Sequence, residues 1–142
     1  MHRPQTTDPA YIFDASSLIN LERQDKLRHL SELGHLVVIH ERIAKEVSKN
    51  PRSDLAKWIV RHPDRINHAP LLADESTLHV RLRQQRTPKV HDPEAIALAI
   101  AWHRKGILVC DDNAALWKAN HHSVTCLKVD QFVQKIEPRM FK

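Results

Sequence analysis

The sequence contains few glycines, cysteines and aromatic residues, and it has no long hydrophobic run. Of its 142 residues, two are glycine and two are cysteine, and Phe, Trp and Tyr together make up 5%. The two cysteines, Cys110 and Cys126, fit a reducing compartment, and we expect no disulfide between them. No apolar run approaches the roughly 18 residues of a membrane-spanning helix, and the polar N-terminus MHRPQTTDPA lacks a signal-peptide core. These absences predict a cytoplasmic protein.

Acidic residues are outnumbered by basic ones. The chain has 22 Lys and Arg against 17 Asp and Glu, which gives a net charge of +5 and an isoelectric point near 9.5. This excess favours polyanionic partners such as nucleic acid, because Lys and Arg neutralise phosphates. The alternative is a basic globular protein without such a partner. The length predicts one domain with its own core.

The two glycines help to divide the chain into elements. Gly34 precedes the apolar run HLVVI, and Gly106 precedes ILVC. Each glycine is typical of a helix end that is followed by a strand. Strands are therefore predicted at residues 11–13, 36–39 and 107–110, with further ones at 65–68 and 124–129. Helical spacing or composition occurs at residues 18–33, 41–47, 53–62, 74–86, 93–106, 113–120 and 130–136.

Strands that alternate with helices predict an α/β fold, a three-layer α/β/α sandwich whose central, mostly parallel sheet has four to five strands. We expect the domain to span residues 11–136. A flexible segment at residues 1–10 would precede it, and a tail at residues 137–142 would follow it.

Acidic residues follow two of the predicted strands. Asp14 ends the first strand, and Asp111 and Asp112 follow the strand at 107–110. Asp92 stands at the start of the alanine-rich helix, and Glu46 lies in the helix after strand 36–39. Taken singly, the aspartates are typical helix N-caps, and Glu46 is typical of a solvated helix position.

Taken together, these acids indicate a metal site. The carboxyl ends of strands in an open α/β sheet form a common edge, so the acids can converge there. Converging carboxylates repel one another, and a divalent cation would relieve the repulsion. Hard oxygen ligands favour Mg²⁺ or Mn²⁺, which can activate water for phosphodiester cleavage.

Four segments in order resemble the motifs of the PIN-domain family, which includes VapC-type toxins and related endoribonucleases. The segments are YIFDASSLI, VVIHERIAKEV, HDPEAIALAIA and ILVCDDNAAL, and the likeness covers roughly residues 11–135. The resemblance implies a Mg²⁺- or Mn²⁺-dependent ribonuclease in the cytoplasm, acting as the toxin of a toxin–antitoxin pair. It also implies a homodimer, an RNA substrate and a cognate antitoxin protein as partner.

The resemblance assigns roles to individual residues. Metal ligands and catalytic residues would be Asp14, Glu46, Asp92 and Asp112, with Asp111 as a further ligand. Ser16 and Glu94 would support them. Three positions depart from the family pattern, namely Ala15, His91 and Cys110. At Cys110, a lost hydroxyl would remove a hydrogen bond beside the last acids and weaken metal binding.

Other features leave alternatives open. The segment RLRQQRTPK contains Arg81, Arg83, Arg86 and Lys89, which either guide RNA or form a solvated helix face. The 11 histidines show no zinc-binding spacing. The tryptophans Trp58, Trp102 and Trp117 favour core or dimer packing over base stacking.

Two functional alternatives to the nuclease also stay open. One is a PIN-like module that has lost catalysis and only binds RNA or protein. The other is a phosphoryl-transfer α/β protein in which Asp14 accepts a phosphate and Lys128 assists it.

Overall fold

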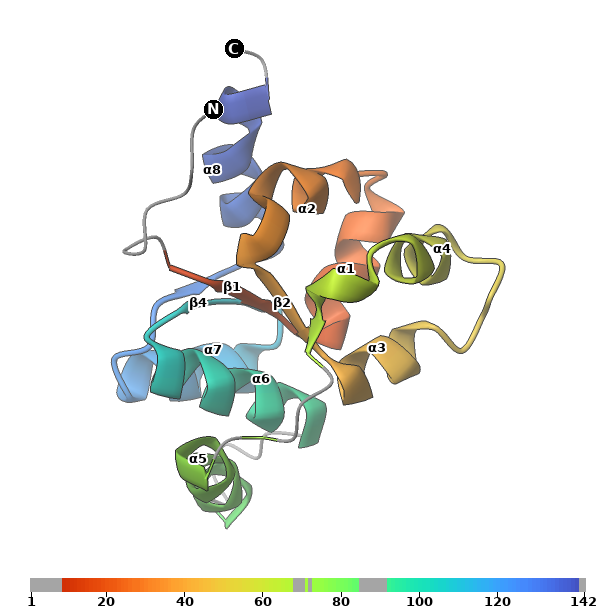
Figure 1. Ribbon diagram of the computed structural model, residues 1–142. Helices are drawn as coiled ribbons and strands as arrows, with labels where there is room; N and C mark the ends of the chain where they lie inside the picture. The colour runs from red at the N-terminus through yellow and green to blue at the C-terminus, as the bar shows by residue number, and fades with distance from the viewer. Residues whose placement is uncertain (1–8, 68–70, 72, 85–91, 141–142) are drawn as a thin grey trace.

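The computed structural model describes residues 9–67, 71, 73–84 and 92–140, and a parallel β-sheet forms its centre (Figure 1). Within this part of the chain the sheet has five strands in the order β3-β2-β1-β4-β5, and every neighbouring pair is parallel. This arrangement confirms the predicted parallel sheet. The strands are β1 (Tyr11–Phe13), β2 (Val37–His40), β3 (Ile66–Asn67), β4 (Ile107–Val109) and β5 (Cys126–Leu127).

Helices cover both faces of the sheet, which confirms the three-layer α/β/α architecture (Figure 1). On one face lie α1, α2 and α8, and on the other lie α6 and α7. Helices α3 and α4 pack beside α1, and α5 packs on the outside of α6. The bounds are α1 (Ala15–Arg23), α2 (Arg28–Leu33), α3 (Glu41–Val47), α4 (Asp54–Arg61), α5 (Ala73–Gln84), α6 (Asp92–Arg104), α7 (Asn113–His121) and α8 (Val129–Met140).

The helical spacing at residues 18–33 is confirmed, but it is divided between two helices. The chain leaves α1 after Arg23 and enters α2 at Arg28. Asp25 adopts a positive φ of 57°, and the N–H of Lys26 donates to the carbonyl of Leu21 at 2.9 Å. This bond pattern ends a helix. The leucine spacing continues across the turn because both helices face the same core.

The last helix is longer than the sequence predicts. Helix α8 continues to Met140, so part of the predicted tail at residues 137–142 is helical. In this extra turn Glu137 accepts a hydrogen bond from Lys26 Nζ at 2.9 Å and lies 3.3 Å from His29 Nε2. At the other end, most of the predicted flexible segment lies outside the described residues.

Helix α6 is apolar on all sides because other elements surround it. Every residue from Ala95 to Ala101 is buried. The helix packs against β1, β2 and β4 on one side and against α5 and α7 on the other. A helix in such a position has no polar face to show. None of the described helices is long and apolar enough to cross a membrane.

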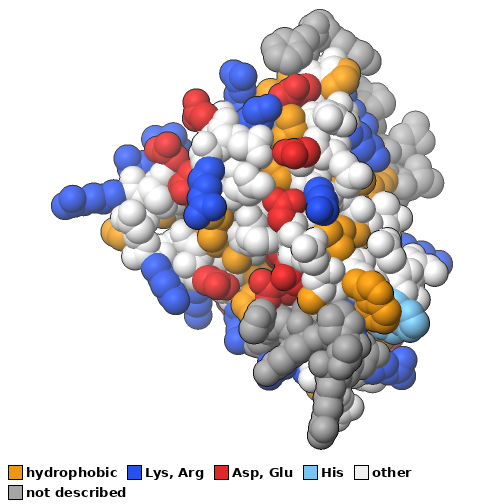
Figure 2. Space-filling view, turned by 180° about the vertical axis from the view of Figure 1, so that it is seen from behind, with side chains coloured by type: hydrophobic (Ala, Val, Ile, Leu, Met, Phe, Trp, Pro, Cys, Tyr) orange, Lys and Arg blue, Asp and Glu red, His pale blue; other side chains and the backbone are white. Residues whose placement is uncertain are grey.

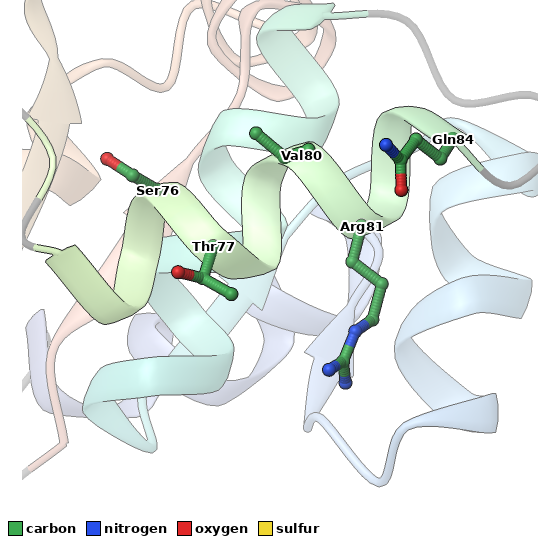
Figure 3. A pocket seen from close by; sticks show the side chains of 5 residues that line it. All are labelled: Ser76, Thr77, Val80, Arg81 and Gln84. Carbon is green, nitrogen blue, oxygen red and sulfur yellow. The ribbon is translucent and has the colours of Figure 1, made fainter.

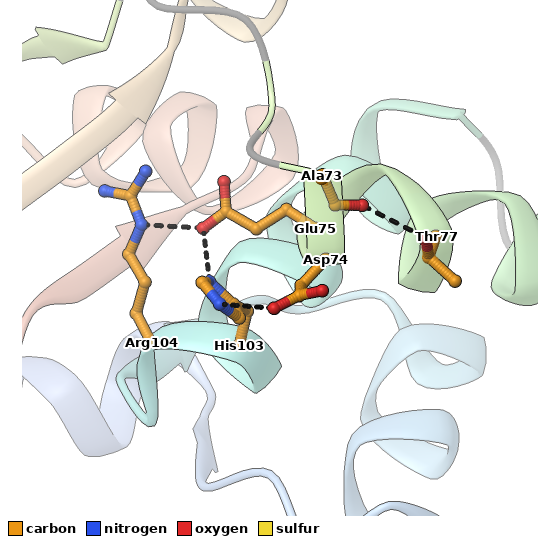
Figure 4. A network of polar contacts seen from close by, with 6 residues as sticks. All are labelled: Ala73, Asp74, Glu75, Thr77, His103 and Arg104. Atoms are coloured by element: carbon orange, nitrogen blue, oxygen red, sulfur yellow. Dashed lines mark hydrogen bonds and ion pairs between the residues drawn. The ribbon is translucent and has the colours of Figure 1, made fainter.

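Helix α5 is fixed to α6 by a buried carboxylate. Glu75 is fully buried, and its Oε2 accepts hydrogen bonds from Arg104 Nε at 2.8 Å and from His103 Nδ1 at 3.1 Å (Figure 4). His103 Nε2 also lies 3.6 Å from a carboxylate oxygen of Asp74. His103 and Arg104 at the end of α6 therefore anchor the first turn of α5.

Candidate active site

Strands β1 and β4 lie side by side at the centre of the sheet, and an acidic segment follows each of them. Their register pairs Phe13 with Val109, so Asp14 and Cys110 are the next residues along the two strands. The N–H of Asp14 donates to the carbonyl of Val109 at 3.5 Å. Because the strands are parallel, Asp14 and the segment 110–112 leave the sheet at the same edge.

The Asp14 carboxylate is fully buried and is held by three hydrogen-bond donors. Its Oδ1 accepts a bond from the Ser17 N–H at 2.9 Å, and its Oδ2 accepts bonds from Ser16 Oγ at 2.9 Å and Cys110 Sγ at 2.8 Å. The Ser17 bond makes Asp14 the N-cap of α1. This cap takes one lone pair of Oδ1 and leaves the other for a ligand.

Burial raises the pKa of Asp14 above its ordinary value, although the hydrogen bonds from Cys110, Ser17 and Ser16 lower it in part. Among the described residues, no Lys, Arg or His forms an ion pair with this carboxylate. A buried carboxylate without a cation is destabilised by the loss of water. A cation bound beside Asp14 would oppose this loss.

Cys110 joins the two acidic segments. Its Sγ contacts Asp14 Oδ2 and accepts a bond from the N–H of Asp112 at 3.3 Å. Burial, together with the charge of Asp14, raises the pKa of the thiol far above its ordinary value, so the thiol stays neutral and donates. The expectation that cysteine removes a hydrogen bond here is wrong, because the thiol serves as the donor. Cys110 and Cys126 are both free.

Asp111 and Asp112 are adjacent but have different partners. Asp112 is the N-cap of α7, and its Oδ2 accepts a bond from the N–H of Ala115 at 2.9 Å. Asp111 accepts bonds on both oxygens, from Asn20 Nδ2 and from the N–H of Val129 at 3.0 Å. Asp112 Oδ1 has no hydrogen-bond partner in the described part of the chain. This difference favours Asp112 over Asp111 as a metal ligand.

Asn20 is a site residue that the sequence analysis does not identify. Its Nδ2 donates to Asp111, and its Oδ1 accepts a bond from Gln24 Nε2 at 2.9 Å. Asn20 lies four residues after Ser16 on α1, so both side chains lie on one face of the helix. No local signal in the sequence identifies Asn20, because its partner Asp111 lies 91 residues away.

Glu46 is exposed on α3, the helix that directly follows β2. It lines a hollow of about 440 Å³ together with Arg42, Lys45, Lys49 and Pro93. Pro93 belongs to the first turn of α6 and directly follows Asp92. The hollow therefore brings Glu46 close to the start of the helix on which the sequence analysis places two further acids.

The remaining predicted site residues are only partly described. Asp92 begins α6, as predicted for its helix, but its side chain lies outside the described residues. Arg86, Lys89 and His91 lie wholly outside them. Glu94 is half-buried in the first turn of α6. Ala15, which departs from the family pattern, is buried in the first turn of α1.

Arg81 and Arg83 are exposed on α5. Arg81 lines a shallow depression of about 410 Å³ with Ser76, Thr77, Val80 and Gln84, and its guanidinium extends away from the helix (Figure 3). Both arginines are thus accessible to a ligand in solution.

Carboxylate oxygens form the donor set that Mg²⁺ and Mn²⁺ prefer. Asp14 and Asp112 supply such oxygens at one edge of the sheet, and acidic side chains run through the middle of the face shown in Figure 2. In the described residues, which leave out the Asp92 side chain, no three His, Cys, Asp or Glu side chains form a metal-binding group. The buried Asp14 carboxylate is the feature that fits a divalent cation.

Comparisons with known proteins agree with this fold. The chain is similar in structure to PAE2754 from Pyrobaculum aerophilum, with a TM-score of 0.59 and 16% sequence identity over 93% of this chain and 99% of that one. A search of curated proteins finds no match. A family model described as a PIN domain, DUF3368, matches residues 10–127. The chain therefore belongs to the PIN-domain family, whose members are generally nucleases.

Proposed function

We propose that the protein is a Mg²⁺- or Mn²⁺-dependent endoribonuclease. The observation that carries this proposal is the buried carboxylate of Asp14, which shares the Cys110 thiol with the segment that bears Asp112. Asp92 and Glu46 complete the proposed ligand set. Their support is the position of Asp92 at the start of α6 and the hollow that Glu46 shares with Pro93.

The chain's own residues hold and orient the acids. Ser16, Ser17 and Cys110 fix the orientation of the Asp14 carboxylate, and Asn20 does the same for Asp111. A divalent cation bound there would activate water and stabilise the charge that develops on the phosphodiester. Rigid ligands favour such catalysis because they need no rearrangement during the reaction.

The alternatives have less support from the geometry. A phosphoryl-transfer role for Asp14 would be favoured by a second acid two residues further on, and that position holds Ser16, which donates to the Asp14 carboxylate. A PIN-like module without catalysis is suggested by the departures at Ala15, His91 and Cys110. The Cys110 thiol retains a hydrogen bond to Asp14, which weakens that argument at one of these three positions.

The toxin role and the partners are finer parts of the proposal. The likeness to VapC-type toxins supports an RNA substrate, a cognate antitoxin and a homodimer. A basic chain with a net charge of +5 also suits an RNA substrate. The toxin role would be supported by a neighbouring gene that encodes an antitoxin. The product of that gene should block RNA cleavage by this chain.

The proposal is tested by RNA cleavage with Mn²⁺ and the variant Asp14→Asn. We expect this variant to fold, since Asn is also a good N-cap, and to lose activity by roughly 100-fold or more. Calorimetric titration should show that it also binds Mn²⁺ more weakly. Asp54→Asn is the matched control, because Asp54 is exposed in the first turn of α4.

Two results would contradict the proposal. One is cleavage by the wild type that persists in excess chelator. The other is an Asp14→Asn variant that cleaves RNA as fast as the Asp54→Asn control. Mn²⁺ binding that depends on Asp14 without any RNA cleavage would instead support the binding module.

A further inference from the structure

The C-terminal half of α7 presents an exposed aromatic ring. Trp117 is 52% exposed, whereas Trp58 is 7% exposed and belongs to the core. Trp102 is half-buried against α7. Trp58 is therefore a core residue, as one of the two predicted roles requires, whereas Trp117 is not, and dimer packing of Trp117 stays a prediction. An indole ring of this size in contact with water needs an explanation, because exposed aromatic surface is typical of binding sites.

Trp117 is the outer member of a row of four aromatic rings that contact one another. Trp102 stacks on His122 with ring centroids 4.3 Å apart, and His122 contacts the edge of His121 at 5.1 Å. His121 lies parallel to Trp117, with a centroid distance of 5.0 Å and an interplanar angle of 8°. We call Trp117, His121 and His122 the α7 aromatic surface. The half-buried Trp102 thus anchors its exposed end, so a ligand would meet a ring that is already oriented.

The α7 aromatic surface is surrounded by positive charge. Helix α7 contains no Asp or Glu. Lys118 Nζ lies 5.9 Å from the centre of the Trp117 ring, but the lysine side chain is buried, so it contributes charge and no accessible contact. The pKa of His122 is lowered by burial first and then by the positive charges of His121, Lys118 and Arg81. Arg81 of α5 extends away from its helix (Figure 3) and acts on His122 from a second element.

The same helix joins this surface to the candidate active site. Asp112 is the N-cap of α7, and Trp117 lies five residues further on, or roughly 7.5 Å along the helix axis at 1.5 Å per residue. Stacked nucleotides in one strand are about 3.4 Å apart. Measured along the helix axis alone, this separation corresponds to about two nucleotide steps.

We propose that the α7 aromatic surface is a binding site for single-stranded RNA, with a base stacked on the exposed Trp117 and a backbone phosphate beside the exposed Arg81. An aromatic ring next to cations is the combination that binds single strands without a paired partner. A base in a duplex has both faces covered, so this site selects unpaired RNA. The inference rests on the proposed ribonuclease function, since it names the form of its substrate.

The test is binding of a single-stranded oligoadenylate of about 10 nucleotides to the full chain, with chelator present so that no cleavage occurs. We expect Trp117→Ala to bind roughly 5- to 100-fold more weakly, and Trp117→Phe to lose less because it keeps a ring. Val60→Ala is the matched control, since Val60 is 78% exposed on α4. On a strand of the same length with abasic sites, the penalty of Trp117→Ala should disappear.

Three results would overturn the site. One is a Trp117→Ala variant that binds like Val60→Ala, even if the wild type cleaves RNA with Mn²⁺. Another is an equal penalty on the abasic strand. The third is a dimer that becomes monomeric in Trp117→Ala while RNA binding stays unchanged, which would assign the surface to a second copy of the chain. Binding that depends on Trp117 in a protein that never cleaves RNA would keep the site and refute the nuclease.

Discussion

At the scale of single residues, the Asp14 carboxylate caps a helix and also forms part of the candidate site. Its Oδ1 satisfies the N–H of Ser17, while its Oδ2 contacts Ser16 and Cys110. The sequence alone offers these roles as alternatives, since an aspartate before a helix is a common N-cap. The geometry makes them compatible, because the cap orients the same carboxylate that is proposed to bind the metal.

Cys110 allows the first prediction at this scale. The Cys110→Ala change removes one of the donors to Asp14 Oδ2, and we expect the affinity for Mn²⁺ to fall by about 10- to 100-fold, the usual effect of losing a partner behind a metal ligand. Cys110→Ser should bind Mn²⁺ like the wild type, because a hydroxyl also donates. Calorimetric titration measures both affinities.

The control for this prediction is Cys126→Ala. Cys126 lies on the neighbouring strand, half-buried, and its pKa is raised by burial to about 12. Its hydrogen-bond partners in the described residues do not include Asp14. Equal Mn²⁺ affinities in Cys110→Ala and Cys126→Ala would show that the thiol at position 110 does not support the ligand.

The residues found from the sequence are those with a strong local signal. Asp14, Asp111 and Asp112 each follow a short apolar run, and the strand ends place them correctly at one edge of the sheet. Asn20 was missed because its partner Asp111 lies 91 residues away. A single sequence holds no information on which polar side chains meet across such a separation.

At the scale of elements, the shortage of glycine affects how helices end. Helices α1, α6 and α7 are each followed by a residue with positive φ that is not glycine: Asp25, Lys105 and Ser123. After α6, the N–H of Gly106 donates to the carbonyl of Ala101 at 2.9 Å. In this pattern the left-handed position belongs to Lys105 rather than to the glycine. Gly34, in contrast, does take a positive φ of 59° at the end of α2.

Gly106 is needed for space rather than for its backbone angle. A Cβ atom there would lie 2.5 Å from Ile12 Cδ1 and 2.8 Å from the carbonyl oxygen of Ala10. The sequence correctly predicts a helix end followed by a strand at this glycine. It does not show which residue adopts the left-handed angle, because that depends on how closely α6 approaches β1.

The Lys105→Gly change should therefore stabilise the protein. Glycine adopts a positive φ without the steric penalty of a side chain, so we expect a gain of about 0.5–1 kcal/mol in the free energy of unfolding. The matched control is Lys57→Gly, which places glycine inside α4 at an exposed position and should cost about 1 kcal/mol. Urea denaturation measures both. A loss of stability in Lys105→Gly comparable to that in the control would contradict the helix end described here.

At the scale of the whole molecule, the order of strands and helices follows from the sequence. Short apolar runs and helical spacing predict the parallel sheet and its two covering layers, because each signal is local. The packing of α5 on the outside of α6 and the exposure of Trp117 are not predictable in this way. Both depend on which helix faces are left uncovered after the sheet has formed.

The distribution of charge over the molecule gives the last prediction. The net charge is +5, and the proposed RNA site combines a stacking ring, Trp117, with a phosphate-binding cation, Arg81. For a single strand, the logarithm of affinity falls with the logarithm of salt concentration with a slope of about −0.7 per phosphate contact. Arg81→Gln should remove one phosphate contact and reduce the steepness of the slope by about 0.7. Trp117→Ala should weaken binding at every salt concentration and leave the slope unchanged.

Arg28→Gln, at an exposed position on α2, is the control and should alter neither the affinity nor the slope. Oligoadenylate binding measured across a salt series separates the two contributions. A Trp117→Ala variant that changes the slope, or an Arg81→Gln variant that does not, would show that stacking and charge are assigned to the wrong residues.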